Sequence, residues 1–407
     1  MLLQKPAFLL FYHARAAEAS FGEWLGVLWH GLSLDCTVAG YVTAFPVVVV
    51  LASFWIPLSQ RVWRIVLTVY FSLIALVTAA IFAVDLNLYG YWGFRLDGSV
   101  LIYLSDPGEA LASASWGEVL RQILIMLVYA GAMIWSYRWI LRLFRVEPVP
   151  LRGRIVPTVA ALLIGGLTFL AIRGGVTVAT ANVSKVYFSS NMFLNHAATN
   201  PVFSFLSSVG DNENYAEAYP FFEEERRKTL FEELRGNRPG ADAGTPRLLR
   251  SDRPNVVLIL LESFGRTIMD ETVNGEPVMP NMQRFKREGV WFENFFANSF
   301  RTDRGQVAVL CGFPAQTTMS IMKLPRKSAT LPSLARSLGR EGYRSVFMYG
   351  GDLNFTNQAS FMYSTGWEEL IWQKDMQLDA PTSKWGYADD VVVDLFGDEV
   401  EALGRAE

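Results

Sequence analysis

The sequence predicts a helical transmembrane part followed by an α/β sandwich with a mainly parallel sheet. The first 173 residues contain long apolar runs, and 51% of the 407-residue chain is hydrophobic. From residue 254 onward, short apolar runs alternate with segments of helical periodicity, which is the pattern of βαβ units. We therefore expect a membrane domain over 1–173, a linker over 174–253 and an α/β domain over 254–407.

Four apolar stretches are long enough to cross a bilayer, which takes about 20 residues. They are Thr37–Pro57, Val62–Val84, Val119–Ile140 and Ile155–Ile172. Residues 2–12 are apolar but too few for a full crossing, so we interpret them as a short first span. Residues 18–35 mix apolar and polar positions, which predicts an interfacial helix with His30 and Asp35 wet at the headgroup level. The alternative is that His30 and Asp35 are functional residues.

The distribution of Lys and Arg in short loops predicts the orientation of these spans. The loop 59–64 carries Arg61 and Arg64, and the loop 138–154 carries five arginines, so both should be cytoplasmic. The intervening loop 85–116 is mixed or acidic, with Asp106 and Glu109 among its residues, and should face outward. Five crossings from a cytoplasmic N-terminus then place everything after about residue 174 outside the cytoplasm.

Composition narrows the function. A net charge of −3 argues against a nucleic-acid partner, which needs a clustered basic face. Cys36 and Cys311 lie far apart in the sequence, and no Cys-x-x-Cys metal spacing exists. In the linker, Glu223–Leu234 predicts a charged helix, and the Gly- and Pro-rich residues 236–254 predict a flexible tether.

The α/β domain begins with Val256–Leu261, a continuous apolar run that predicts a strand buried on both faces. Further elements follow in order. They are a helix over Pro280–Gly289, a strand over Val290–Phe296, helices over Asp303–Gly312 and Leu331–Gly339, and a strand over Arg344–Tyr349. Glu262 is the first polar side chain after the first strand, where a carboxylate suits Mg²⁺ or Mn²⁺. The alternative role for Glu262 is to cap the following turn.

Thr302 is expected at or just before the N-terminus of a helix, where backbone amides and the helix dipole favour an anion. A Thr hydroxyl attacks only when a metal or base removes its proton, and a metal beside Glu262 would supply that activation. The alternative is that Thr302 or Asp303 simply caps the helix.

Several stretches together resemble the lipoteichoic acid synthase and phosphoglycerol transferase family of the sulfatase and alkaline-phosphatase-like superfamily. They are the apolar anchor, Leu261-Glu262-Ser263, Thr302-Asp303, Tyr349-Gly-Gly-Asp-Leu-Asn-Phe355 and Tyr363-Ser-Thr-Gly-Trp367. The resemblance covers nearly the whole chain and is most specific over residues 254–370.

The resemblance implies that Glu262 is a metal ligand and that Thr302 is both ligand and nucleophile. One Mn²⁺ or Mg²⁺ would activate Thr302 to attack a phosphatidylglycerol-like lipid of the bilayer, releasing diacylglycerol. The glycerophosphate group would then pass to a hydroxyl of a glycan or polymer acceptor, on the outer side of a bacterial cytoplasmic membrane. Tyr349 falls near the position where the synthases use a His. Arg304, Asp352 and Asn354 are candidates for the headgroup pocket, with surface or turn roles as the alternative.

The sequence also departs from the family. Its metal site is completed by a downstream Asp-His pair and its substrate site by a further His, whereas no His follows residue 254 here. We therefore expect a C-terminally truncated chain with half a metal site and little turnover of its own. The alternatives are a phosphoethanolamine transferase, a sulfuric or phosphoric ester hydrolase of the same superfamily, and an inactive membrane partner. A true sulfatase is disfavoured because the sequence after Cys311 lacks the Cys-x-Pro-x-Arg pattern.

Overall fold

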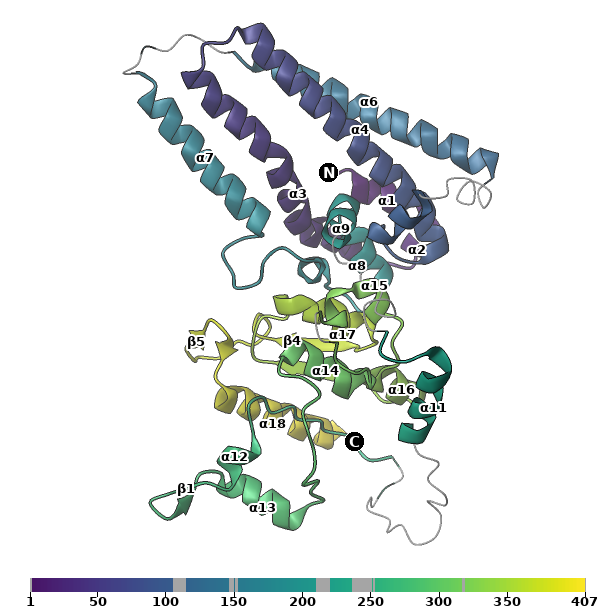
Figure 1. The fold of residues 1–407 in the computed structure, drawn as a ribbon, viewed down its shortest axis with the longest axis vertical. Coiled ribbons are helices and arrows are strands. Elements are labelled where there is room, and N and C mark those ends of the chain that lie inside the picture. The colour runs from purple at the N-terminus through teal and green to yellow at the C-terminus, as the bar shows by residue number, and fades with distance from the viewer. Residues whose placement is uncertain are drawn as a thin grey trace. The chain divides into compact units, whose positions relative to one another are not determined.

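The computed structural model describes residues 2–104, 115–145, 150, 153–209, 220–235, 251, 253–316 and 319–406 (Figure 1). Asp106, Glu109, Arg152 and the tether residues 236–250 lie outside the described residues. The chain divides into two units. The first combines Met1–Asp211 with Asp303–Glu407, and the second is Asn212–Thr302.

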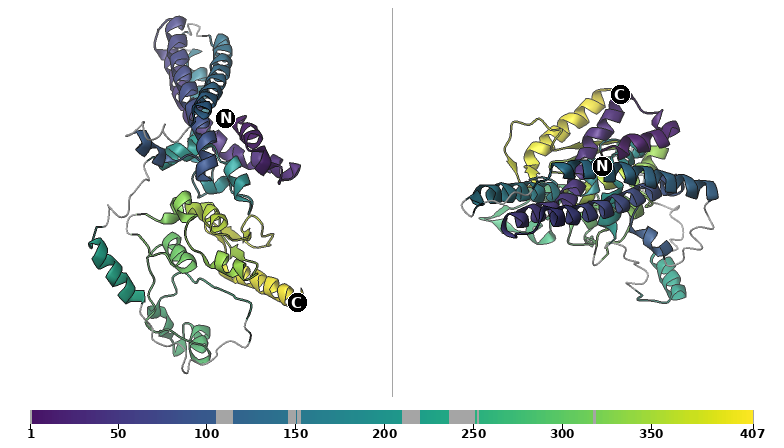
Figure 2. Two further views of the ribbon diagram at one scale, coloured as in Figure 1. Left: turned by 90° about the vertical axis from the view of Figure 1, so that its right-hand side faces the viewer. Right: turned by 90° about the horizontal axis from the view of Figure 1, so that it is seen from above.

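Among the described residues of the first unit, four helices are long and apolar enough to cross a membrane. They are α3 (Phe21–Trp55), α4 (Gln60–Trp92), α6 (Trp116–Leu143) and α7 (Ile155–Arg173). Each contains most or all of one predicted span. Ser20 and Ser115 begin α3 and α6 with capping boxes, and Gly93 and Gly174 end α4 and α7 in the left-handed conformation. The helices pair as α3 with α7 and α4 with α6. Figure 1 labels all four helices, and Figure 2 shows them from two further directions.

The predicted interfacial helix over 18–35 is not a separate element. Residues from Phe21 onward belong to the same continuous helix, α3, as the following span. Asp35 is buried rather than wet, because Lys5 Nζ lies 2.6 Å from its carboxylate and Asn200 Nδ2 donates to it at 2.7 Å. The His30 ring stacks on Phe188. Contacts with segments distant in the sequence thus account for the polar positions of this stretch.

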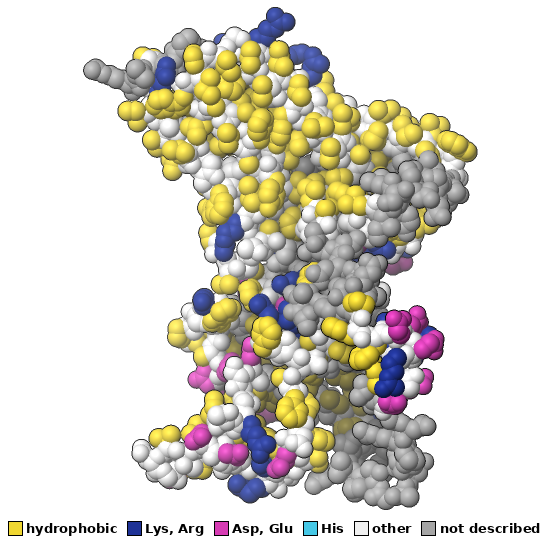
Figure 3. All heavy atoms as spheres, in the orientation of Figure 1, with side chains coloured by type: hydrophobic (Ala, Val, Ile, Leu, Met, Phe, Trp, Pro, Cys, Tyr) yellow, Lys and Arg dark blue, Asp and Glu magenta, His cyan; other side chains and the backbone are white. Residues whose placement is uncertain are grey.

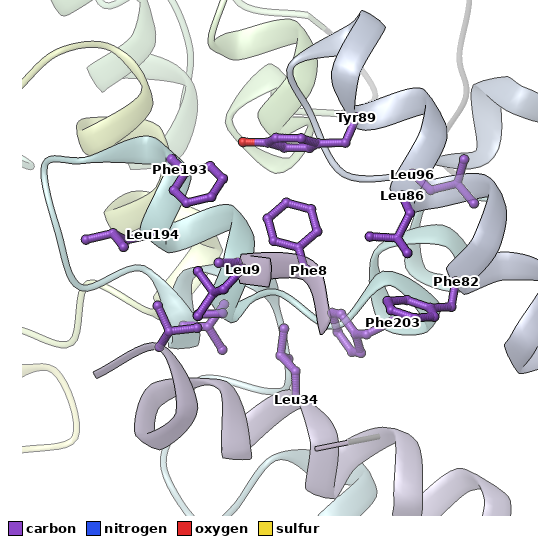
Figure 4. Close-up of a cluster of buried hydrophobic side chains, with 14 of the residues drawn as sticks. Phe8, Leu9, Leu34, Phe82, Leu86, Tyr89, Leu96, Phe193, Leu194 and Phe203 are labelled. Carbon is purple, nitrogen blue, oxygen red and sulfur yellow. The ribbon is translucent and has the colours of Figure 1, made fainter. Parts of the chain in front are cut away.

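The predicted short first span forms α1 (Gln4–Phe11), followed by α2 (His13–Ala16). Eight residues of helix rise about 12 Å, far short of a bilayer core. Phe8 and Leu9 are buried in a cluster with side chains of α3, α4, α8 (Met192–Ala198) and α9 (Pro201–Ser208), drawn in Figure 4. Arg95 lies over the Phe8 ring at 4.3 Å and pairs with Asp85 at 3.0 Å. The count of five crossings therefore stays a prediction.

Short elements connect the long helices to the remainder of the first unit. They are η1 (Gly98–Leu104) and η3 (Val183–Val186), with α8 and α9 following. Asparagine caps begin three of them, because Asn182, Asn191 and Asn200 each accept a hydrogen bond from the backbone of the helix that follows.

The C-terminal part of the first unit alternates short helices and strands around its own core. The elements are α14 (Thr302–Cys311), η4 (Ile321–Lys323), α15 (Pro325–Ser328), α16 (Leu334–Arg340), β3 (Val346–Tyr349), η5 (Phe355–Asn357), α17 (Gln358–Ser364), β4 (Glu369–Trp372), β5 (Thr382–Ser383), β6 (Gly386–Tyr387) and α18 (Asp389–Ala406). Strands β3 and β4 pair in parallel, with Val346 opposite Glu369, and β5 pairs with β6 antiparallel. Leu310, Met322, Leu353 and Phe361 lie in the core.

The second unit holds α11 (Glu224–Arg235), α12 (Arg266–Met269), the β1–β2 hairpin (Thr272–Val273 and Glu276–Pro277) and α13 (Pro280–Glu288). Helices α11 and α13 confirm two predictions. The segments 256–261 and 290–296, predicted as strands, have no strand assignment, and side chains from Val256 to Leu261 are 42% to 60% exposed. A parallel strand is buried only between neighbouring strands and covering layers, and the described residues of this unit offer only the short hairpin.

Candidate active site

Glu262 and Thr302 lie together, as the sequence predicted. The Thr302 hydroxyl donates a hydrogen bond to Oε1 of Glu262. Both residues belong to the second unit, so this contact is internal to one body. A carboxylate and a hydroxyl in contact also need only small movements to reach one shared cation, because Mg²⁺ holds its ligands at about 2.0–2.1 Å.

A tight turn presents the Glu262 carboxylate at the end of the apolar run. Ser263, the next residue, has a φ of 64° in the left-handed region, which is uncommon for a residue other than glycine. The Gly265 amide donates to the Ser263 carbonyl at 3.0 Å, and α12 begins at Arg266. Such backbone conformations cost about 1–3 kcal/mol and concentrate at functional sites. The sequence did not predict the left-handed conformation of Ser263, because serine has no particular preference for it.

Thr302 is the first residue of α14, which confirms its predicted place at a helix N-terminus. The first backbone amides of a helix have no partner within it, and together with the dipole they favour an anion there. The next residues, Asp303 and Arg304, are buried, and Ser320 donates to the Asp303 carbonyl at 2.8 Å. The start of α14 is thus fixed by contacts that do not involve the Thr302 hydroxyl.

Two hard oxygen donors suit a Mg²⁺ or Mn²⁺ ion, which often keeps several waters and takes its other ligands from substrate phosphates. Glu262 and Thr302 fit two positions of such a site. Within the described ranges no group of three or more His, Cys, Asp and Glu side chains could hold a metal ion. The pair is therefore a candidate for two ligands of a metal site. The described residues do not identify the other ligands.

Asp352 and Asn354 have the turn role that the sequence left as the alternative. Oδ1 of Asp352 accepts hydrogen bonds from the backbone and side-chain nitrogens of Asn354, at 2.9 and 2.8 Å. The Phe355 amide donates to the Asp352 carbonyl at 3.0 Å. Asn182, in the segment after α7, donates to the Asn354 carbonyl at 2.8 Å. These bonds hold the loop after β3 in one shape.

Arg304 and Tyr349 occupy other places in the first unit. Arg304 borders a cavity of about 10 Å³, room for about one water molecule. Tyr349 ends β3, and its ring lies so close to Gly351 that a Cβ there would approach the ring to 2.8 Å. The relation of these two residues, and of Asp352 and Asn354, to the Glu262–Thr302 pair stays a prediction.

Lys185 is a basic residue near this loop that the sequence analysis missed. It lies in η3, and its ammonium group donates to the carbonyl of Gly174 at the end of α7. Burial lowers the pKa of Lys185, while the charge of Asp352 acts in the opposite direction. A lone lysine in a linker carries no pattern, so only the fold reveals its proximity to Asp352.

Comparison with known proteins finds relatives of the segment that contains this pair. Residues 254–405 match the sulfatase family model, over the range that contains both Glu262 and Thr302. The match is confined to this segment and does not extend to the long apolar helices. Phosphoglycerol transferase I of Xanthomonas campestris pv. campestris is 35% identical over 167 residues, covering 38% of this chain and 23% of that protein. Phosphoglycerol transferase I of Salmonella paratyphi B is 27% identical over 161 residues, covering 37% of this chain and 21% of that protein.

The chain thus spans less than a quarter of the length of these curated relatives. A solved structure of a protein in the alkaline phosphatase superfamily, from Vibrio parahaemolyticus, is 28% identical and covers 31% of each chain, with a TM-score of 0.30. That score is too low for an argument about three-dimensional similarity. The similarity to this family therefore rests on the sequence matches alone.

Proposed function

We propose that this chain is a membrane-anchored transferase that moves a glycerophosphate group from a phosphatidylglycerol-like lipid to an acceptor hydroxyl. The observation that carries the proposal is the hydrogen bond from Thr302, at a helix N-terminus, to the Glu262 carboxylate. Its setting, a sulfatase-family segment behind four candidate membrane helices, supports a lipid substrate. The similarity to phosphoglycerol transferases supports the transferred group.

In the first step, the Thr302 oxygen attacks the phosphorus atom of the lipid phosphodiester. A new Thr oxygen–phosphorus bond forms, the bond from phosphorus to the diacylglycerol oxygen breaks, and diacylglycerol leaves with the proton that the Thr302 hydroxyl has lost. Glu262 accepts the hydrogen of the Thr302 hydroxyl and so orients the nucleophile. The N-terminal amides of α14 favour the anionic phosphate. A bound Mn²⁺ or Mg²⁺ would lower the pKa of the hydroxyl and offset phosphate charge.

In the second step, a hydroxyl of a glycan or polymer acceptor attacks the phosphorus of the Thr302-linked group. The Thr302 oxygen leaves and regains its proton, which restores the starting state. The positive charges of loops 59–64 and 138–154 support a cytoplasmic location of both loops, and therefore an outer location of the transferase site on a bacterial cytoplasmic membrane.

The test follows release of fluorescent diacylglycerol from fluorescent phosphatidylglycerol, in membranes of cells that express the gene of this chain, with Mn²⁺ added. Thr302→Ala should reduce release at least 1,000-fold, since removing a nucleophile typically costs more than the loss of a single stabilising contact. Glu262→Gln should raise the Mn²⁺ concentration needed for half-maximal release. Thr272→Ala and Glu271→Gln, at exposed positions near the β1–β2 hairpin, are the matched controls.

Release that survives Thr302→Ala would exclude this nucleophile. Release from phosphatidylethanolamine but not from phosphatidylglycerol would support a phosphoethanolamine transferase. Release of soluble glycerophosphate without any acceptor would indicate an ester hydrolase. No release from any of these lipids by the wild-type gene product would support an inactive membrane partner.

A further inference from the structure

The start of α4 carries a groove that the proposed transfer chemistry does not use. The groove has a volume of about 350 Å³, within the usual range for small-molecule sites. Its lining residues all belong to α4 and are Gln60, Arg61, Arg64, Ile65, Thr68 and Val69. Because Arg61, Ile65 and Val69 follow one another at intervals of four residues, they share one face of the helix. The groove is therefore positively charged at the end that holds Arg61 and Arg64, and apolar at the end that holds Ile65 and Val69.

The polar end is fixed to the neighbouring helix. Gln60 Nε2 donates to the carbonyl of Phe144, the residue after α6, at 2.9 Å, and Arg64 donates to the same carbonyl at 3.3 Å. Arg61 is exposed and has no ion-pair partner among the described residues. The sequence of α4 contains no acidic side chain before Asp85. As far as the described residues go, this end of the groove thus carries positive charge without a carboxylate partner for Arg61.

The apolar end continues toward the middle of a helix that is apolar enough to cross a membrane. Ile65 and Val69 are 52% and 63% exposed, so their side chains are available to an external apolar group. Figure 3 shows Lys and Arg side chains at the margin of the broad apolar surface of the long helices. A site with cations at the margin and exposed aliphatic groups below it matches a molecule with an anionic head and a hydrocarbon tail.

We infer that this groove binds one anionic phospholipid, with its phosphodiester between Arg61 and Arg64 and an acyl chain along Ile65 and Val69. Basic pockets beside transmembrane helices hold anionic lipid headgroups through this combination of charge and apolar contact. Gln60 and Arg64 set the height of the headgroup because both are anchored on Phe144. The site is separate in sequence from Glu262 and Thr302, and its existence does not depend on the transferase activity.

The inference is tested by native mass spectrometry of the full chain released from nanodiscs. Phosphatidylglycerol should remain bound at concentrations where phosphatidylcholine with the same acyl chains does not. The double variant Arg61→Gln/Arg64→Gln should weaken phosphatidylglycerol binding roughly thirtyfold, because each basic residue near an anionic lipid contributes about 1 kcal/mol. The matched control is Arg142→Gln, which removes a charge from the last turn of α6 outside the groove and should change binding less than threefold.

Further variants separate a lipid site from a simple phosphate site. Ile65→Ser/Val69→Ser should weaken binding of the lipid, and soluble glycerol phosphate at the same concentration should not displace it. The variant Arg61→Lys/Arg64→Lys keeps both charges and should keep most of the affinity for the lipid. If it loses affinity as strongly as the Gln variant, the cause is misfolding and not the loss of charge. Equal binding of phosphatidylcholine, an equal loss in Arg142→Gln, or displacement by glycerol phosphate would each overturn the inference.

Discussion

Cys311 shows how burial decides the chemistry of a single residue. It lies in the core beside Leu310 and Met322, and burial raises the pKa of its thiol to about 11. A protonated, enclosed thiol is inert at neutral pH. Cys311→Ala should therefore leave diacylglycerol release within about twofold of wild type. A sulfatase that depends on a modified cysteine would instead lose its activity, so abolished turnover in Cys311→Ala would contradict the Thr302 mechanism.

His196 carries a pH dependence of stability. Burial lowers the pKa of His196 to about 3, in a site formed by the rings of Tyr89, Phe94 and Tyr187. The unfolded chain takes up a proton below a pKa of about 6.5, whereas the folded chain does not until about 3. The stability that His196 contributes is thus complete above pH 6.5 and declines as the pH falls from 6.5 toward 3.

Lowering the pH from 7 to 5 should cost about 2 kcal/mol of unfolding free energy through His196, since one pKa unit corresponds to about 1.4 kcal/mol. The measurement is denaturant unfolding in detergent micelles at both pH values. The pH-dependent loss should shrink in His196→Gln and persist in the control His13→Gln. If the wild-type chain and His196→Gln lost the same unfolding free energy between pH 7 and pH 5, His196 would not be the source of the pH dependence.

Sequence patterns identified the two residues that matter most at this scale. Glu262 follows an apolar run, and Thr302 precedes a helix, so each had a local signal. For Asp352 and Asn354, the sequence could not distinguish a turn from a headgroup contact, because both use the same residue types. The structure shows the turn. The bond from Asn182 to the Asn354 carbonyl joins segments far apart in the chain, and no local pattern predicts it.

At the scale of elements, the loop after β3 depends on close backbone approach. Gly386, in β6, has a φ of 114°, and a Cβ there would lie 2.0 Å from the Gly350 carbonyl oxygen. The Tyr387 amide donates to the same carbonyl at 3.0 Å, so the two segments cannot move apart without losing this bond. The contact connects β6 to the loop that holds Asp352.

Gly386→Ala should lower the free energy of unfolding by roughly 3 kcal/mol, combining backbone strain with the steric overlap. Gly312→Ala is the matched control, because Gly312 has a φ of 63° but no atom within 4 Å of its added Cβ. That control should cost about 1 kcal/mol. Chemical denaturation of both variants checks the difference, and equal losses would show that the approach to Gly350 is unimportant.

Elements differ in how far sequence predicts them. The four long helices followed from length and hydropathy, which are local properties. The run 256–261 has the composition of a buried strand, yet strand pairing depends on partners elsewhere, and the described part of its unit provides none. The helix α3 extends through the predicted interfacial segment because Lys5 and Asn200, both distant in the sequence, satisfy Asp35.

At the scale of the whole molecule, charge distribution predicts which side of the membrane each part occupies. In a background of Cys36→Ala and Cys311→Ala, a membrane-impermeant maleimide applied to spheroplasts should label Ser251→Cys but not Ser59→Cys. Both should be labelled after detergent is added. Labelling of Ser59→Cys in intact spheroplasts would reverse the proposed orientation and place the transferase site on the cytoplasmic side.

The central claim about the molecule is that Thr302 carries the transferred group between lipid and acceptor. The most direct measurement incubates the membrane-bound enzyme with phosphatidylglycerol and no acceptor, quenches it in acid, and maps modified peptides by mass spectrometry. We expect a glycerophosphoryl group on Thr302, and no such group in Thr302→Ala. A group found on another residue, or turnover by Thr302→Ala, would contradict it.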